Sequence, residues 1–226
     1  MNSLQRLIAA YPFAPYVAPF VTFVALLGLH SLLPLPPLTS EILWLTLMVL
    51  VILSIARPAL DLSLKSPILS ILLGIFVFLI WIGPDVAFPG YRHHLENAVV
   101  GAVKSSLPVE ARTNMPVLAL RSIRAAIIVP IVEELFWRAW MMRWVISPNF
   151  QKVALGAYTP FSFWMVAVLF ASEHGPYWDV GLAAGILYNW WMIRTRSLGD
   201  LVLAHAVTNA CLSAYVIVAG KWEYWL

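Results

Sequence analysis

Long apolar stretches, separated by short polar connections, make up most of this chain and restrict what it can fold into. The chain has 226 residues, of which 62% are hydrophobic and 11% are charged. A soluble domain of this length would carry more charge to cover so much apolar surface. The composition therefore predicts an integral membrane protein.

Seven stretches approach the length that a bilayer-spanning helix requires. A hydrocarbon core of about 30 Å needs roughly 20 apolar residues in helical form. The sequence therefore predicts an all-α, polytopic membrane helix bundle, a single integral-membrane domain over residues 1–226. We expect about seven transmembrane helices, at Phe13–Leu33, Ile42–Ala56, Pro67–Phe88, Ala125–Ile146, Tyr158–Glu173, Val180–Ile193 and Leu201–Ala219.

The segment between the third and fourth stretches has a different pattern. From Tyr91 to Leu107, apolar residues recur at helical spacing and most charged residues fall between them. This pattern predicts an amphipathic helix at the membrane interface, with an ordinary extramembrane connector as the alternative. Arg112, Arg121 and Arg124 continue the polar character until the fourth stretch begins. Basic residues are scattered along the chain, so we expect no nucleic-acid partner.

Three short patterns place ionisable residues inside the later apolar stretches. They run from Glu133 to Arg138, from Phe170 to His174 and from His205 to Asn209. A charged side chain at bilayer depth costs several kcal/mol, so it needs a partner, a wet cavity or a function. Each pattern alone is better explained as a packing contact between helices than as a functional site. Three of them on successive late segments predict one buried polar site.

Helical spacing divides these residues into two groups. Residues four apart share a helix face, which predicts an ion pair between Glu134 and Arg138 and places His205 and Asn209 together. Glu133 diverges from Glu134 by about 100° and is left to face a cavity.

The three patterns are expected to meet although one stretch separates His174 from His205. That stretch is short, about 14 residues or roughly 21 Å. Gly181 and Gly185 give it a small-residue surface that permits close packing of helices.

The ordered trio Glu-Glu-x-x-x-Arg, Phe-x-x-x-His and His-x-x-x-Asn resembles the CPBP (CAAX protease and bacteriocin-processing, or Abi) family of intramembrane proteases. This family includes the Rce1-type CAAX prenyl endopeptidases. The motif-bearing core covers about residues 115–219. Val129-Pro130 before the glutamates and Glu173 before His174 resemble a bacterial branch associated with exosortase-type sorting systems. Ala139 stands where many relatives carry Gly after the motif arginine.

The resemblance implies an intramembrane endopeptidase that hydrolyses a membrane-tethered peptide through a Glu- and His-activated water. It also implies a multi-pass protein in the lipid bilayer of a bacterial inner (cytoplasmic) membrane. The catalytic residues it implies are Glu133, His174, His205 and Asn209, with Glu134 and Arg138 as structural support.

Each of these residues suits a step of peptide hydrolysis. Glu133 can act as general base, and His174 can help to orient the water. Asn209 and His205 can donate hydrogen bonds to the tetrahedral oxyanion.

A divalent metal such as zinc is the alternative to a metal-free water. Glu133, His174 and His205 are acceptable zinc ligands, with water in the fourth position. The chain lacks the His-Glu-x-x-His helix that supplies two ligands and a base together. If Glu133 bound a metal, Glu173 would be a candidate base. We favour the metal-free reading.

Two other function classes fit the buried polar residues. One is a non-catalytic membrane scaffold or immunity protein of the same fold, which uses the polar pocket for binding. The other is a proton-coupled transporter, since Glu and His at membrane depth suit proton relays. The absence of an internal repeat weighs against the transporter.

Overall fold

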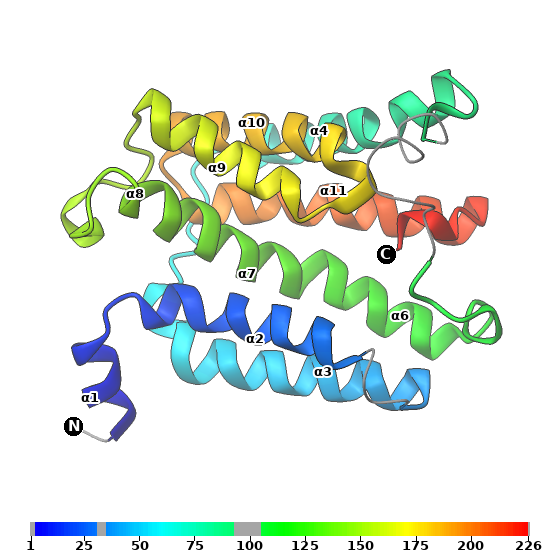
Figure 1. Cartoon of the computed structure of the whole chain (residues 1–226), viewed down its shortest axis with the longest axis horizontal. Helices are drawn as coiled ribbons and strands as arrows, with labels where there is room; N and C mark the ends of the chain where they lie inside the picture. The colour runs from blue at the N-terminus through cyan, green and yellow to red at the C-terminus, as the bar shows by residue number, and fades with distance from the viewer. Residues whose placement is uncertain (1–2, 31–34, 93–104, 226) are drawn as a thin grey trace.

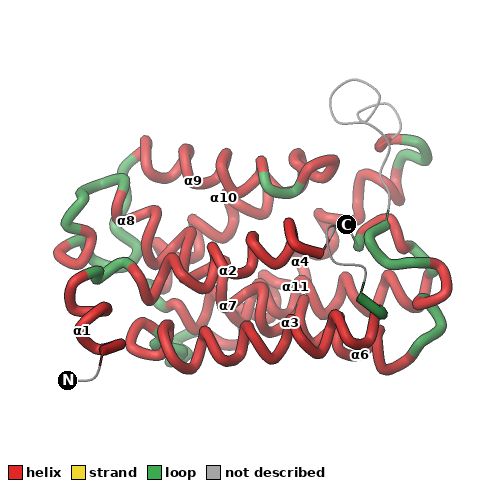
Figure 2. The backbone as a smooth tube through the Cα atoms, turned by 60° about the horizontal axis from the view of Figure 1, so that its bottom comes forward, coloured by secondary structure: helices red, strands yellow, loops and turns green. Residues whose placement is uncertain are grey.

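The structure, a computed structural model, describes residues 3–30, 35–92 and 105–225. This described part is mostly helical and contains no strand, as Figure 2 shows. The predicted all-α membrane bundle is confirmed. The helices are α1 Ser3–Ala10, α2 Ala14–His30, α3 Pro37–Val51, α4 Pro67–Ala87, α6 Met115–Ile123, α7 Val129–Glu134, α8 Met142–Trp144, α9 Pro160–Ser172, α10 Trp178–Thr195 and α11 Leu198–Ala219.

A helix lies at each of the seven expected positions. In the described part of the chain, four are long and apolar enough to cross a membrane: Pro37–Ala59, Pro67–Ala87, Met115–Trp144 and Leu198–Ala219. Two more apolar helices are shorter, Ala14–Leu29 and Pro160–Ser172. The number of seven crossings therefore stays a prediction. Most of the predicted interfacial helix falls on residues 93–104, which lie outside the described residues.

The fourth helix begins ten residues earlier than the expected Ala125. π-helical stretches join α6, α7 and α8 into one continuous helix, Met115–Trp144. One of these stretches directly precedes α7, where Pro130 lacks the N–H that an α-helical turn would use. Arg121 and Arg124 are therefore helical and do not belong to a connector. The helix tolerates their charges because the Glu41 carboxylate of α3 lies 3.6 and 2.8 Å from their guanidinium groups.

The long helix from α6 to α8 runs through the middle of the bundle, as Figure 1 shows. Helices α2 and α3 pack together on one side of it, while α4, α9, α10 and α11 lie on the other. Helix α11 packs along α4 and also contacts α7. The first and third motifs therefore face each other inside the bundle.

Close backbone contacts hold the helices around the site. A Cβ atom at Gly74 of α4 would lie 2.4 Å from the Ala204 carbonyl oxygen of α11. A Cβ at Gly185 of α10 would lie 3.1 Å from the Ala167 carbonyl oxygen of α9. A Cβ at Gly74 would force the backbone to shift, and a Cβ at Gly185 would require its neighbours to move by a few tenths of an ångström. The close packing predicted for the short stretch is present at Gly185.

The first turns of α4 and α11 are also tied together. The Asp200 carboxylate of α11 accepts hydrogen bonds from the backbone N–H groups of Lys65 and Ser66, at 3.0 to 3.2 Å. Ser197 caps α11 by accepting from the Asp200 N–H at 3.1 Å. These contacts fix the start of the helix that carries His205.

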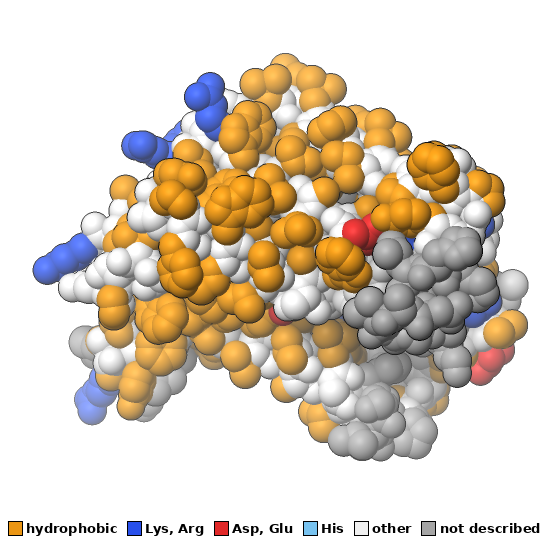
Figure 3. Space-filling model, turned by 45° about the horizontal axis from the view of Figure 1, so that its top comes forward, with side chains coloured by type: hydrophobic (Ala, Val, Ile, Leu, Met, Phe, Trp, Pro, Cys, Tyr) orange, Lys and Arg blue, Asp and Glu red, His pale blue; other side chains and the backbone are white. Residues whose placement is uncertain are grey.

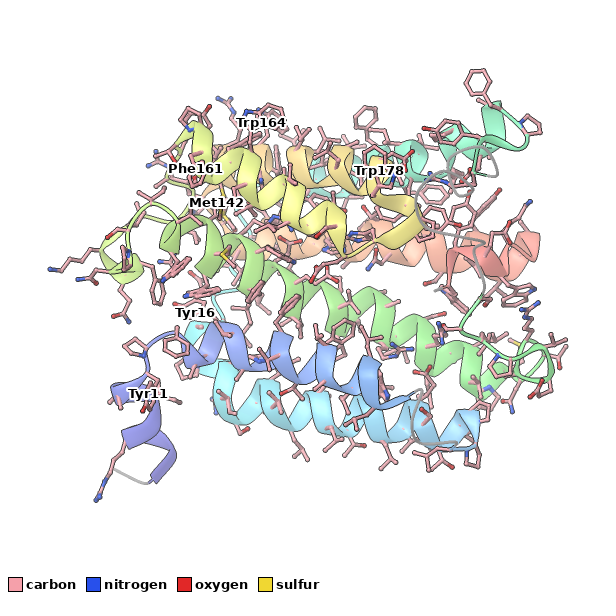
Figure 4. All side chains as sticks on the ribbon, viewed as in Figure 1. Tyr11, Tyr16, Met142, Phe161, Trp164 and Trp178 are labelled. Atoms are coloured by element: carbon pink, nitrogen blue, oxygen red, sulfur yellow. The ribbon has the colours of Figure 1, made fainter. Side chains whose placement is uncertain are left out.

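The outside of the bundle is apolar. Figure 3 shows hydrophobic side chains across most of the visible face. Phe161 and Trp164 of α9 are 70% and 52% exposed and point away from the bundle, whereas Met142 is buried (Figure 4). An exposed apolar surface of this extent is typical of a lipid-facing protein.

Candidate active site

A buried ionic cluster joins the first and third motifs. Nη1 of Arg138 lies 3.1 Å from both carboxylate oxygens of Glu134, and both side chains are fully buried. The ion pair predicted from their spacing is therefore present. Nδ1 of His205 lies 2.7 Å from Oε1 of Glu134. The Glu134 carboxylate thus orients the His205 ring and leaves its Nε2 available to the cavity described below.

Arg138 connects this ionic cluster to the neighbouring helices. Its Nε donates to Oδ1 of Asn189 at 2.9 Å, and Nδ2 of Asn189 donates to the Phe163 carbonyl oxygen at 2.8 Å. The guanidinium also lies 4.2 Å from the centroid of the Phe170 ring. The sequence reasoning missed Asn189. Its position four residues after Gly185, on the same helix face, was the signal that could have found it.

Glu133 has different surroundings from its neighbour Glu134. Its side chain is 8% exposed, and within the described structure its Oε2 has no hydrogen-bond partner. A carboxylate oxygen that is buried without a partner is costly, so such a group calls for a functional explanation. Glu133 lines a cavity of about 240 Å³.

The same cavity brings the three motifs together. His174 from the α9–α10 connection lines it, as do His205 and Asn209 of α11. Glu134 and Arg138 lie behind the wall and do not line it. The structure thus places all four residues expected to be catalytic around one space, while their catalytic roles stay a prediction.

His174 is held in a defined tautomer. Its Nδ1 lies 2.8 Å from the Phe170 carbonyl oxygen, which can only accept a hydrogen bond. Nδ1 therefore carries the proton, and Nε2 of the neutral ring is an acceptor. The ring packs against Trp81, with centroids 5.1 Å apart, and a Cβ at Gly181 would lie 3.2 Å from it.

Asn209 is anchored to the central helix. Its Nδ2 donates to the Ala125 carbonyl oxygen at 2.9 Å, which leaves one of its two amide hydrogens for another acceptor. Tyr188 supports the neighbouring turn, because its hydroxyl donates to Oγ1 of Thr208 at 2.8 Å and its ring stacks on His205.

Three further charged residues line the cavity. Glu173 is exposed and accepts a hydrogen bond from Nε1 of Trp137 at 3.0 Å. Arg121 and Arg124 also contribute to the lining. The sequence reasoning had placed these two arginines before the fourth span, outside the site.

The described residues do not form a recognisable metal site. Nowhere in the described ranges do three His, Cys, Asp or Glu side chains group as a metal ion requires. Nδ1 of His174 contacts the Phe170 carbonyl and Nδ1 of His205 contacts the Glu134 carboxylate, so Nε2 of each ring is the nitrogen left for a ligand. The choice between a bound zinc and a metal-free water stays a prediction.

One comparison with known proteins is positive. Residues 115–211 match the family model described as type II CAAX prenyl endopeptidase, Rce1-like. No curated protein and no solved structure matches the chain. The matched segment contains the long central helix and all three motifs. This segment, which is less than half of the chain, is similar to the Rce1-like type II CAAX prenyl endopeptidases.

Proposed function

We propose that the protein hydrolyses a membrane-tethered peptide with a water molecule activated by Glu133 and His174. The observation that carries this proposal is the buried Glu133 carboxylate, whose Oε2 lacks a partner in the described structure, in one cavity with His174, His205 and Asn209. A base, an acceptor for orienting water and donors for an oxyanion are the groups that amide hydrolysis requires.

The proposed reaction begins with a water molecule between Glu133 and His174. One hydrogen atom of this water forms a hydrogen bond to Nε2 of His174. Glu133 accepts the other hydrogen as a proton while the water oxygen attacks the peptide carbonyl carbon. The resulting oxyanion accepts a hydrogen bond from the free amide hydrogen of Asn209. Nε2 of His205 donates a second one when that ring carries two protons. The C–N bond then breaks, and the proton on Glu133 passes to the leaving amine.

This mechanism has no metal-dependent step. The experiment is to treat purified protein with a chelator, remove the chelator and measure peptide cleavage together with bound metal. We expect unchanged cleavage at substoichiometric metal content. Loss of cleavage that added zinc restores would contradict the metal-free mechanism.

The substrate is proposed to be anchored in the bilayer, in a bacterial cytoplasmic membrane. Purified protein in liposomes would be given one peptide in two forms, with and without a lipid anchor. We expect the anchored form to be cleaved faster, and His174→Ala to abolish cleavage of both. Undiminished cleavage by His174→Ala would overturn the proposed site. Equal cleavage of both forms would overturn the proposed tethering.

A further inference from the structure

A second pocket lies outside the reaction cavity, at the end of the bundle where Figure 1 shows α8, opposite the C-terminus. It has a volume of about 290 Å³. Its lining comes from points where four segments begin or end: Tyr16 near the start of α2, Leu60 after the span Pro37–Ala59, Arg143 of α8 and Leu198 at the start of α11. No residue of the three motifs lines it.

This pocket opens at the depth of the lipid headgroups. The central helix Met115–Trp144 has 30 residues, which correspond to about 45 Å at 1.5 Å per residue. A bilayer with its headgroup regions is about 40–45 Å thick, so Arg143, one residue before the end of this helix, lies near its edge. Trp144 and Tyr158 are exposed at the same end, where Trp and Tyr side chains typically meet the membrane surface. Lys and Arg side chains also project there (Figure 3).

Arg143 has hydrogen-bond donors left for a ligand. Its Nε donates to the Ala139 carbonyl oxygen at 2.5 Å, and its Nη1 donates to that of Val153 at 3.4 Å. Its Cζ lies 5.5 Å from the centroid of the Tyr16 ring, which restricts the position of the guanidinium. Two of the five N–H donors of a guanidinium are thus used, and Arg143 forms no ion pair with a carboxylate of the described ranges. Such a group suits phosphate oxygens.

Asp61 brings an opposite charge to the same pocket. Hydrogen bonds from the Ser63 side chain and backbone lower the pKa of Asp61, so its carboxylate is charged at neutral pH. The nearby Lys65 ammonium donates instead to the carbonyl oxygens of Thr195 and Arg196, at 3.2 and 2.8 Å. Among the described residues, Asp61 has no ion-pair partner. The pocket therefore presents one guanidinium and one carboxylate that are both available.

The rest of the lining is mostly apolar. Ala139 and Leu198 are buried, whereas Leu60 and Leu155 are half-buried. A matching ligand carries a phosphate, a cation a short chain away, and an apolar part. Phosphatidylethanolamine has all three, and its ammonium can donate hydrogen bonds to a carboxylate. Phosphatidylcholine has no N–H to donate, and phosphatidylglycerol has no cation for Asp61, so the pocket can discriminate among these lipids.

We propose that this pocket binds the headgroup of phosphatidylethanolamine, with the phosphate on Arg143 and the ammonium on Asp61. The bound lipid connects α2, the central helix and the start of α11, and it stabilises the folded bundle because it binds the folded state. The proposal is independent of the proposed peptidase reaction, since neither residue lines the reaction cavity.

The test titrates purified protein in detergent with dioleoyl forms of phosphatidylethanolamine, phosphatidylcholine and phosphatidylglycerol. Native mass spectrometry gives the Kd of each lipid, and thermal unfolding gives its effect on stability. Wild-type protein is expected to bind phosphatidylethanolamine about 3- to 10-fold more tightly than the other two, because the exposure of Asp61 weakens a charged hydrogen bond. The same lipid is expected to raise the unfolding temperature most.

Substitutions separate the two charges. Arg143→Gln is expected to weaken binding of all three lipids, because each carries a phosphate, and Arg143→Lys is expected to keep part of the affinity. Asp61→Asn is expected to remove only the preference for phosphatidylethanolamine over phosphatidylcholine. Arg194→Gln is the matched control, because Arg194 is exposed in the last turn of α10 and does not line the pocket. It is expected to bind all three lipids as the wild type does.

Three results would overturn the proposal. One is equal affinity of wild-type protein for phosphatidylethanolamine and phosphatidylcholine. Another is unchanged binding of phosphatidylethanolamine by Arg143→Gln. The third is tightest binding of phosphatidylglycerol, lost in Arg143→Gln, which would assign the pocket to an anionic lipid. Soluble phosphoethanolamine is the last competitor, and displacement of the lipid at an equal Kd would assign the pocket to a free phosphate ester instead.

Discussion

At the scale of single residues, two adjacent glutamates have opposite surroundings. Glu134 contacts Arg138 and His205, whereas Oε2 of Glu133 is buried without a partner in the described structure. Their divergence around the helix axis explains the difference. One carboxylate is thus used to hold the motifs together, and the other is left to face the cavity.

Substitution can distinguish the roles of Glu133 and Glu173, the two acidic residues that line the cavity. Glu173→Gln is expected to keep kcat within about threefold, because the amide oxygen can still accept from Trp137 and general-base catalysis is assigned to Glu133. Loss of a general base typically lowers the rate by about 10²- to 10⁴-fold. A loss of that size in Glu173→Gln, measured as kcat on an anchored peptide, would identify Glu173 as the general base.

The ion pair between Glu134 and Arg138 is expected to stabilise the folded protein. Glu134→Leu leaves the Arg138 charge buried and uncompensated, which is expected to lower the free energy of unfolding by about 3–5 kcal/mol. Unfolding in detergent, followed by tryptophan fluorescence, measures it. Glu223→Leu is the control, because its pair with Lys221 is half-exposed and 3.6 Å long and such pairs contribute at most about 1 kcal/mol. Equal destabilisation by both substitutions would contradict this stabilising role of Glu134.

At the scale of helices, local spacing predicted the contacts within a helix and missed those between helices. The Glu134–Arg138 pair lies four residues apart in one helix and could be read from the sequence. The contacts of Glu134 with His205 and of Arg138 with Asn189 depend on how separate helices pack. The start of the central helix was missed because Arg121 and Arg124 looked like connector residues, and their partner Glu41 lies far away in the sequence.

Helix α4 offers a matched test of close packing. Gly74→Ala would place a Cβ 2.4 Å from the Ala204 carbonyl oxygen, whereas a Cβ at Gly83 meets nothing within 4 Å. Overpacking of this kind costs about 1–3 kcal/mol, while Gly→Ala in an open helical position is neutral or stabilising by up to about 1 kcal/mol. The unfolding temperature of Gly74→Ala should therefore fall below that of the wild type, whereas that of Gly83→Ala should stay the same or rise. Matching shifts would contradict the close contact of α4 with α11.

At the scale of the whole molecule, the charged residues of the site lie inside a bundle whose outside is apolar. The composition was sufficient to predict the membrane bundle, and the three motifs predicted four of the residues that line the cavity, Glu133, His174, His205 and Asn209. The crossing number could not be read from hydropathy, because α9 and α10 are shorter or more polar than the four long apolar helices. The polar residues of the cavity are thus kept apart from the apolar outer surface.

The most direct measurement is kcat of Glu133→Gln on an anchored peptide in liposomes, beside Glu110→Gln, whose side chain is exposed and outside the cavity. Gln is close to Glu in size and cannot accept the proton from water. We expect kcat to fall by about 10²- to 10⁴-fold in Glu133→Gln and to stay near the wild-type value in Glu110→Gln. A folded Glu133→Gln protein that cleaves the peptide at the wild-type rate would contradict water activation by Glu133.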